Sequence, residues 1–381
     1  MKKIYLFYWL LIITFTVPSC ARLDQQTVPT STLPSDPGPH GEPEDEGNFP
    51  TIVPSNSVKI PATWANLYLG GKLVYSLGAL DKNNNLIVQI QALDLSRGTI
   101  TVLYSAVQDG WIYYASIAPD GKVIAMSYSP PLQSDPHVVQ ALYGMPFDQT
   151  QIPQLLFMPP TREDQYTQVE WSPDGKYIYY TYVNYLSPND PNRAYPLYKI
   201  FRMKYPGGEH ELVAEEAYWP RVSPDGSRLV YVSLDPVSGD QRLKIANPDG
   251  NNAQDVALSG SYIPHDKTTP FFSPDGKSII FGGNVAGESY KPDWLAKIIQ
   301  IQSAKAEGKP SDWFSVPLGG GKITQLTHVQ APYLYGNLSP DKKHIVSYAG
   351  NELFVMNPDG SELTTLISGL HSFYGTVSWI R

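Results

Sequence analysis

The chain has 381 residues, with 28 Lys and Arg against 36 Asp and Glu, which gives a formal charge of −8. This acidic balance argues against a nucleic-acid partner, and 35 Pro with 30 Gly argue against a helical bundle because both residues interrupt helices. A single cysteine, Cys20, excludes an internal disulfide framework, a Cys-based zinc site and an iron–sulfur cluster.

Residues 1–20 are predicted to be an export signal. Lys2 and Lys3 precede an apolar run over residues 4–17, the order that a secretory signal requires. This run rises only about 21 Å as a helix, short of the roughly 30 Å hydrocarbon core of a bilayer. With Cys20 at the cleavage position, the segment resembles a bacterial lipoprotein signal, which implies lipidation of Cys20, although Pro18 departs from the family's pattern. The alternative is an ordinary secreted chain that loses Cys20 with the signal.

Residues 21–60 are predicted to be a disordered, Pro-rich, acidic tether. They hold seven prolines and an acidic run over residues 42–46, with no strand or helix periodicity. Such a segment cannot bury enough apolar area to offset the entropy lost on ordering. As a coil it spans roughly 35 Å. We therefore expect an exported lipoprotein, in the periplasm or on the cell surface, that contacts the membrane through its lipid anchor only.

A repeat organises the chain from residue 61 to residue 381. Its mark is the tetrapeptide Ser-Pro-Asp-Gly, in which proline presets φ, aspartate bonds the backbone ahead and glycine takes a positive φ. Apolar and polar residues alternate after it, as in strands. The copies lie at residues 118–121, 172–175, 223–226, 273–276 and 339–342. In the last copy Lys342 replaces glycine, which predicts a looser turn there.

Each unit has a second turn, such as residues 247–250 and 357–360. Four antiparallel strands in about 50 residues make the blade of a β-propeller. The repeat resembles the WD40-like PD40 repeat of TolB-type propellers, and the resemblance implies an all-β, six-bladed β-propeller of four-stranded antiparallel blades. Blades two to six begin near residues 111, 166, 217, 265 and 332. TolB has a folded α/β domain before its propeller, where this chain has the tether, so the resemblance does not extend to TolB's role.

The first blade, over residues 71–105, lacks an inner strand. We predict that the C-terminal segment GTVSWIR supplies it, because Val377-Ser378-Trp379 matches Val169-Glu170-Trp171 of blade three. Closing the ring with a strand from the far end of the chain removes exposed sheet edges. Residues 62–69 are the alternative closing strand.

Residues 292–308 of blade five break the strand pattern. Apolar residues at positions 294, 295, 298, 299 and 301 follow a helical spacing, and Asp293 suits an N-cap. The pattern predicts a short helical insertion, which either docks on its own propeller or serves as a lid or a partner-docking handle.

Motifs for catalysis are missing from the sequence. It contains no G-x-S-x-G pentapeptide, which argues against a propeller-type serine peptidase. Residues 81–85 imitate the start of an EF-hand loop, but Leu86 and Ala92 stand where glycine and glutamate are needed. The seven histidines are scattered, although a propeller can bring distant histidines together at its axis. We predict no catalytic residue, no metal site and no cofactor.

An aromatic residue stands about seven residues before the motif proline in most blades, where the inner strand begins. We predict that these side chains, with two from blade five, rim one mouth of the central channel and bind a ligand. They are Trp111, Tyr166, Tyr218, His265, Lys267, Tyr333 and Tyr374. Aromatic rings offer a large contact area at low entropy cost, with a polar handle on Tyr and Trp. The alternative is that these rings only pack between blades.

Our leading hypothesis is a monomeric, non-enzymatic binding module for an envelope protein, peptide or glycan. One alternative is a propeller-only hydrolase or lyase that acts on an envelope or extracellular polymer. The other is a structural or signalling partner that is engaged through the helix of blade five. Convergent His, Asp and Glu side chains at the axis favour an enzyme, whereas an uncharged aromatic mouth favours binding, and fold alone does not decide.

Overall fold

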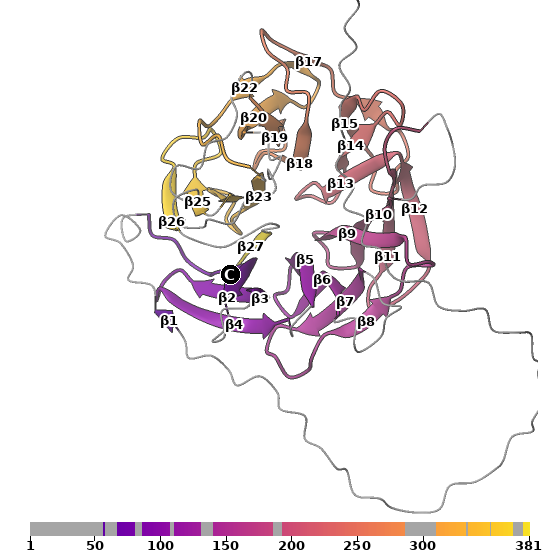
Figure 1. Ribbon diagram of the computed structural model, residues 1–381. Coiled ribbons are helices and arrows are strands. Elements are labelled where there is room, and N and C mark those ends of the chain that lie inside the picture. The colour runs from indigo at the N-terminus through magenta and orange to yellow at the C-terminus, as the bar shows by residue number, and fades with distance from the viewer. Residues whose placement is uncertain are drawn as a thin grey trace, which may run out of the picture. The chain divides into compact units, whose positions relative to one another are not determined.

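Six antiparallel sheets follow one another around a ring (Figure 1). They all belong to one unit of the chain, Pro50–Arg381. The computed structural model describes residues 56–57, 67–80, 86–106, 110–130, 140–185, 193–285, 310–332, 334–350, 352–368 and 376–381. The six-bladed, all-β propeller predicted from the repeats is confirmed. The predicted signal, residues 1–20, and the EF-hand-like residues 81–85 lie outside the described residues, as does most of the tether.

Each blade from two to six is one sheet of four strands that follow one another in chain order, with β21 (Gly321–Lys322) standing between the last two strands of blade five. Blade two contains β5 (Trp111–Ile117), β6 (Val123–Ser129), β7 (Ala141–Pro146) and β8 (Gln154–Phe157). Blade three contains β9 (Asp164–Trp171), β10 (Tyr177–Asn184), β11 (Leu197–Lys204) and β12 (His210–Glu215). Blade four contains β13 (Ala217–Val222), β14 (Leu229–Leu234), β15 (Gln241–Ala246) and β16 (Gln254–Asp255).

The sheets of blades five and six have the same order. Blade five contains β18 (Lys267–Phe272), β19 (Ser278–Asn284), β20 (Ser311–Pro317) and β22 (Thr324–Gln325). Blade six contains β23 (Leu334–Leu338), β24 (Ile345–Ala349), β25 (Glu352–Met356) and β26 (Thr364–Ile367). A short parallel bridge joins blades four and five, between β17 (Leu258–Ser259) and β21 (Gly321–Lys322).

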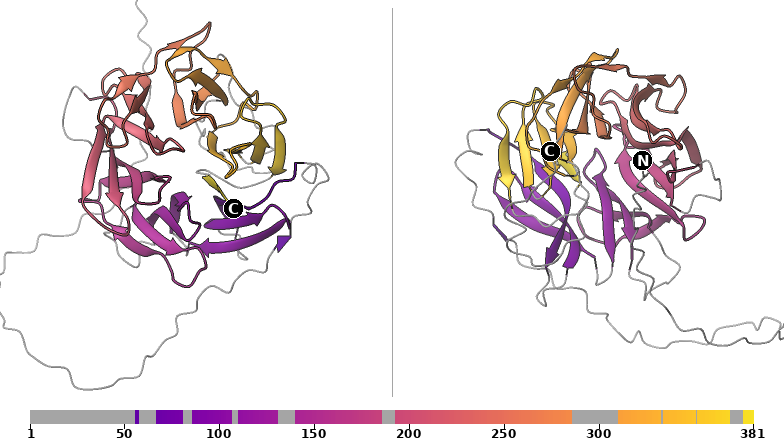
Figure 2. Two further views of the ribbon diagram at one scale, coloured as in Figure 1. Left: turned by 180° about the vertical axis from the view of Figure 1, so that it is seen from behind. Right: turned by 45° about the horizontal axis from the view of Figure 1, so that its top comes forward.

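Blade one closes the ring with both ends of the described chain. Its sheet contains β2 (Lys72–Leu80), β3 (Leu86–Asp94) and β4 (Thr99–Ser105), with β27 (Val377–Ile380) on the inner side and β1 (Asn56–Ser57) on the outer side. β27 pairs antiparallel with β2, with Val377 opposite Tyr75 and Trp379 opposite Leu73. Closure by the C-terminal strand is therefore confirmed, and Figure 2 shows the C-terminus inside the ring.

Two residues of the predicted tether are ordered into blade one. Asn56 lies opposite Ile100, and Ser57 lies opposite Thr99, in an antiparallel pair at the free edge of β4. The tether prediction over residues 21–60 was wrong for this pair, because an open sheet edge offers hydrogen bonds that no composition argument takes into account.

The predicted helical insertion in blade five is not found. The described residues contain strands and turns but no helix, and blade five is built from strands alone. Residues 292–308 themselves lie outside the described residues. A helical spacing over about fifteen residues is a weak predictor, because a helix of that length is marginal unless tertiary packing covers its apolar face. Within the described residues, no helix is long and apolar enough to cross a membrane.

The repeated tetrapeptide makes the hairpin turn between the first two strands of a blade. In blade three, Ser172 Oγ donates to Asp174 Oδ1 at 2.6 Å, and the Tyr177 amide donates to Ser172 Oγ at 2.9 Å. Gly175 has a φ of 70°. These bonds hold the aspartate inside its own turn, so the repeated aspartates are structural.

The looser turn predicted for blade six was wrong. Lys342 takes the glycine's place with a φ of 61°, and its amide donates to the Ser339 carbonyl at 2.9 Å. Ser339 Oγ still donates to Asp341 Oδ1 at 2.6 Å. The side-chain bonds of serine and aspartate hold the turn closed even though a lysine in this conformation costs about 1–2 kcal/mol.

Each pair of neighbouring blades encloses its own hydrophobic core. The core between blades two and three includes Leu142, Tyr166 and Tyr180, and the core between blades six and one includes Tyr348 and Trp379. Because strands point alternate side chains to opposite faces, each blade supplies residues to the cores on both of its sides. The inner edges of the blades are left to line the axis.

Candidate functional site

Three consecutive blades aim a side chain at the axis through a β-bulge in the inner strand. The pairing registers of β9, β13 and β18 with their neighbours all shift near the middle of the strand. At these bulges Gln168, Trp219 and Thr269 have φ values of 52°, 58° and 43°. A β-bulge changes the direction of a side chain, and bulges are common beside functional sites. A positive φ at a non-glycine residue is strained, and it persists only where the surrounding structure holds it in place.

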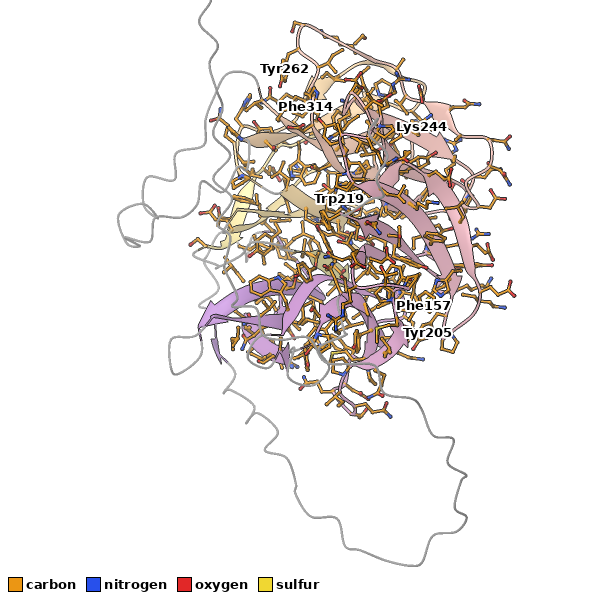
Figure 3. The ribbon with its side chains drawn as sticks, turned by 45° about the vertical axis from the view of Figure 1, so that its right-hand side comes forward. Phe157, Tyr205, Trp219, Lys244, Tyr262 and Phe314 are labelled. Atoms are coloured by element: carbon orange, nitrogen blue, oxygen red, sulfur yellow. The ribbon has the colours of Figure 1, made fainter. Side chains whose placement is uncertain are left out.

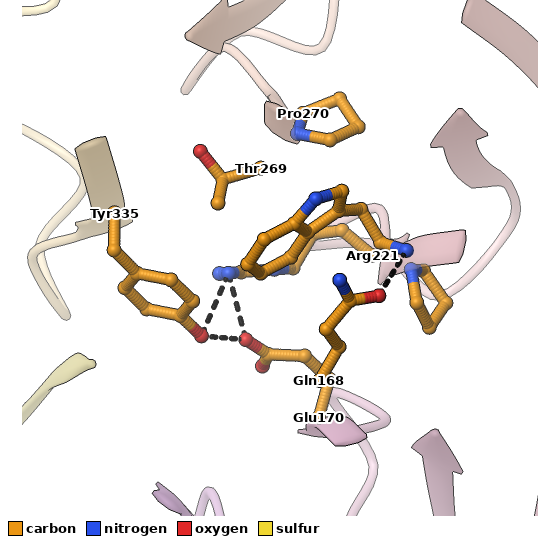
Figure 4. Close-up of a pocket in the computed structure, with 8 residues that line it drawn as sticks. Gln168, Glu170, Arg221, Thr269, Pro270 and Tyr335 are labelled. Atoms are coloured by element: carbon orange, nitrogen blue, oxygen red, sulfur yellow. Dashed lines mark hydrogen bonds and ion pairs between the residues drawn. The ribbon is translucent and has the colours of Figure 1, made fainter. Parts of the chain in front are cut away.

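The three bulges open onto one small pocket at the axis (Figure 4). Side chains of blades three to six line it, and it contains a charged pair. The lining residues are Gln168, Glu170, Trp219, Pro220, Arg221, Thr269, Pro270 and Tyr335. The cavity measures about 10 Å³, which is room for about one water molecule.

A buried ion pair joins blades three and four in this pocket. Arg221 Nη2 lies 2.7 Å from Glu170 Oε1, and their side chains are only 11% and 10% exposed. The Tyr335 hydroxyl of blade six donates to the same carboxylate oxygen and accepts from Arg221 Nη2 at 3.0 Å. Ser116 Oγ of blade two donates to Glu170 Oε2 at 3.3 Å. Both oxygens of Glu170 are therefore engaged, by groups from three other blades.

The surroundings fix the protonation of this cluster. Burial raises the pKa of the Tyr335 phenol well above its ordinary value of 10, so the hydroxyl stays protonated and can donate. Burial alone disfavours the charged form of Arg221, but Glu170 and Tyr335 raise the pKa of the guanidinium. Arg221 therefore keeps its charge and the Tyr335 hydroxyl keeps its proton through the physiological pH range.

The Trp219 ring crosses the axis from blade four and lies amid the blades in Figure 3. Its ring centre lies 5.5 Å from that of Tyr114 in blade two, edge to face, and 6.2 Å from that of Tyr335 in blade six. The Trp219 amide donates to Gln168 Oε1 at 2.8 Å, and Thr181 Oγ1 donates to the same oxygen at 2.7 Å. We define Gln168, Glu170, Trp219, Arg221 and Tyr335 as the axial cluster, which lies across the axis as a floor below the channel mouth.

Two of the side chains predicted at the mouth are buried between blades. Tyr166 is 3% exposed and stacks on Phe157 at 5.6 Å, and Tyr218 is 9% exposed and lies 5.1 Å from the Tyr198 ring. Their positions in the inner strands turn these rings sideways into the cores and not toward the axis. Both residues therefore pack as the alternative interpretation expects.

Blade two and blade five place three further predicted residues at the end of the ring where the inner strands begin. Trp111 is partly buried against the core between blades one and two. The His265 side chain is 59% exposed, and its Nδ1 lies 3.0 Å from Asp266. Lys267 is buried, its Nζ donates to the carbonyls of Pro264 at 2.7 Å and His265 at 3.1 Å, and burial lowers its pKa.

The remaining two predicted residues, Tyr333 and Tyr374, lie outside the described residues. Cys20, the predicted lipidation site, also lies outside them. Among the described residues, no group of three or more His, Cys, Asp or Glu side chains is placed to hold a metal ion.

Sequence reasoning missed the axial cluster, although a signal for it exists. Gln168, Trp219 and Tyr335 each stand five residues before the motif proline of their blade, and Glu170 and Arg221 each stand three before it. An acidic and a basic residue in equivalent positions of otherwise apolar inner strands predict an ion pair across neighbouring blades. The aromatic residues that were predicted to bind a ligand stand about seven residues before the motif proline, which is two positions before Gln168, Trp219 and Tyr335.

Comparisons with solved structures identify the fold. TolB from Acinetobacter baumannii aligns with a TM-score of 0.54 and 16% identity, over 84% of this chain and 68% of that one. The putative TolB from Agrobacterium tumefaciens aligns with a TM-score of 0.50 and 14% identity, over 82% and 99%. A chain of the nidogen/laminin complex aligns with a TM-score of 0.52 and 12% identity, over 81% and 98%. No family model and no curated protein matches the sequence. The chain thus has a TolB-like six-bladed propeller fold, as the repeats predicted.

Proposed function

We propose that this protein is an exported, lipid-anchored propeller that binds an envelope protein, peptide or glycan and catalyses no reaction. The observation that carries the proposal is the axial cluster. A general acid or base must reach the substrate with a free proton or lone pair. Here Glu170 is paired with the Arg221 guanidinium, and its two oxygens accept hydrogen bonds from Tyr335 and Ser116. The one carboxylate of the cluster is therefore engaged in holding four blades together.

The small size of the axial pocket favours a ligand that rests on the mouth. The pocket among the side chains of the axial cluster has room for about one water molecule, so a peptide or sugar cannot lodge in it. The mouth above this floor carries the exposed His265 and the partly exposed Trp111. An imidazole and an indole on a rigid floor offer contact area with few rotamers to immobilise.

The anchor part of the proposal rests on the sequence. Lipidation of Cys20 holds the mature chain at the membrane, and the arm is shortened by β1, which begins at Asn56. Residues 21–55 as a coil span roughly 33 Å. This reach lets the propeller meet partners in the envelope while it stays anchored.

Two experiments test the two parts of the proposal. The mature protein should partition into detergent and carry a diacylglyceryl mass on Cys20, and Cys20→Ser should release it into the soluble fraction. A soluble wild-type protein that starts at another residue would overturn the anchor. For binding, the immobilised protein is exposed to solubilised envelope proteins and glycans.

The binding experiment needs a control at the opposite end of the ring. His265→Ala with Trp111→Ala should abolish capture while the melting curve stays nearly unchanged, and Lys122→Ala, in a turn at the other end, should leave capture intact. If the purified wild-type protein breaks down an envelope polymer and the Glu170→Gln variant does not, the protein is an enzyme and the proposal is refuted.

A further inference from the structure

The outer edge of blade two is an uncharged apolar strand. β8 pairs with β7 on one side, and no strand among the described residues covers its other side. Ile152, Leu155 and Met158 are 57%, 46% and 37% exposed. The sequence from Gln149 to Thr161 contains no charged residue. Exposed apolar groups that gather on one segment are typical of an interaction site, and an open strand edge is a template for pairing with another chain.

The outer edges of blades three, four and five are protected in ways that β8 is not, whereas the outer strand of blade six, β26, is four residues long and uncharged like β8. In blade three, β12 is flanked by two ion pairs, Arg202 with Glu211 at 2.5 Å and Lys199 with Glu215 at 3.0 Å. In blades four and five, the outer strands β16 and β22 are only two residues long. Charges and short length are the usual protection of a sheet edge. Of the outer strands of blades two to five, only β8 combines a length of four residues, three of them paired with β7, with an uncharged, apolar surface.

Blade one shows that this fold accepts an added strand at the equivalent edge. There β1 (Asn56–Ser57) pairs antiparallel with β4 as a fifth strand. β4 and β8 are both the fourth strand of their blades, on the side away from the axis. An extended segment therefore fits against the outer edge of a blade, as the chain's own N-terminal segment demonstrates.

We propose that β8 binds an extended, uncharged and apolar segment of a partner protein as the fifth strand of blade two. Main-chain hydrogen bonds supply the affinity in this mode, and alternate side chains supply the specificity. The segment around Leu155, residues 149–161, has no charged residue that could pair with a charge, so it favours a partner segment without one. Pro153 and Pro159 lack an amide hydrogen and end the ladder on either side of the strand. The paired segment is therefore short.

This surface lies on the outer side of its blade and is independent of the channel mouth, so the inference goes beyond the proposed function. An apolar strand edge could also bind a second copy of the chain or a lipid surface. The neutral edge and the precedent of β1 favour a peptide strand, and the experiment distinguishes the three.

The test compares two leucines of equal exposure on two outer strands. Leu155 on β8 is 46% exposed, and Leu212 on β12 is 47% exposed. The full chain with Cys20→Ser is titrated with a fluorescent octapeptide of alternating threonine and valine, and binding is followed by anisotropy. Leu155→Lys should weaken binding about tenfold or more, the loss of a contact worth about 1.4 kcal/mol. Leu212→Lys should leave binding unchanged.

A second measurement does not depend on any variant. In hydrogen exchange, the peptide should slow exchange of the amides of residues 154–157 in the wild-type sequence and leave β12 unaffected. Absence of binding, or equal loss in both lysine variants without protection of β8, would overturn the proposal. A dimer in sedimentation that Leu155→Lys dissolves would assign the edge to a second copy. Flotation with neutral phosphatidylcholine vesicles that Leu155→Lys abolishes would assign it to lipid.

Discussion

The axial ion pair allows a sharp test of how the blades are held together. Arg221→Met removes the guanidinium and keeps an unbranched apolar side chain of similar reach. Glu170 then stays 10% exposed without a cation, while Tyr335 and Ser116 still donate to it. Removing one partner of a buried pair costs about 3–5 kcal/mol. This is a large part of the about 5–15 kcal/mol that stabilises a folded domain.

The double variant separates the net value of the pair from the cost of an orphaned charge. Glu170→Met with Arg221→Met replaces both ions by apolar side chains, and such replacements are often neutral or stabilising. The double variant should therefore be more stable than Arg221→Met alone.

Urea unfolding followed by tryptophan fluorescence at pH 7 measures these differences in stability. Arg242→Met is the control, since Arg242 pairs with Asp255 at 3.2 Å while the two side chains are 64% and 43% exposed. An exposed pair of this kind contributes about 0–1 kcal/mol. Our reasoning fails if Arg221→Met is no more destabilising than Arg242→Met, or if the double variant is as unstable as the single one.

Three further predictions address closure, turns and pH. Deleting residues 374–381 removes β27 and opens a sheet edge, so it should lower the melting temperature far more than deleting residues 21–55, and equal melting temperatures would contradict this. Gly250→Ala places a Cβ 1.9 Å from a backbone oxygen, whereas the space around Gly226 is open. Gly250→Ala should therefore destabilise the protein by well over the about 1–2 kcal/mol expected for Gly226→Ala. Urea unfolding compares the two variants, and equal losses of stability would refute the clash. Burial lowers the pKa of His210 below 6.5 in the folded protein. As the pH falls, His210 is therefore protonated in the unfolded chain before it is protonated in the folded one. The stability, which is complete above pH 6.5, is lost as the pH falls toward the lower pKa of the folded state. Thermal melts from pH 8 to pH 5 should show this loss, and an equally steep loss in His210→Phe would assign it to another group.

Local patterns along the chain were enough to predict the repeat and its turns, and they predicted the strand that closes the ring with residues 62–69 as the alternative. Ser172, Asp174 and Gly175 form their turn through bonds within a few residues, so the tetrapeptide predicts its own geometry wherever it occurs. The match of residues 377–379 to the inner strand of another blade was sufficient to predict β27. These features are local, or they repeat a local pattern, so the composition and the spacing of residues are enough to predict them.

The residues that meet at the axis, and the direction in which the inner-strand aromatic rings point, depend on how the blades pack together. A period of two assigns side chains to two faces of a strand but does not say that Tyr166 faces a core, or that a bulge turns Trp219 toward the channel. Glu170 and Arg221 are about 50 residues apart, and Tyr335 is more than 100 residues farther along the chain. Each comes from a different blade, so their meeting depends on how six sheets pack around one axis, and no local pattern in the chain specifies that packing.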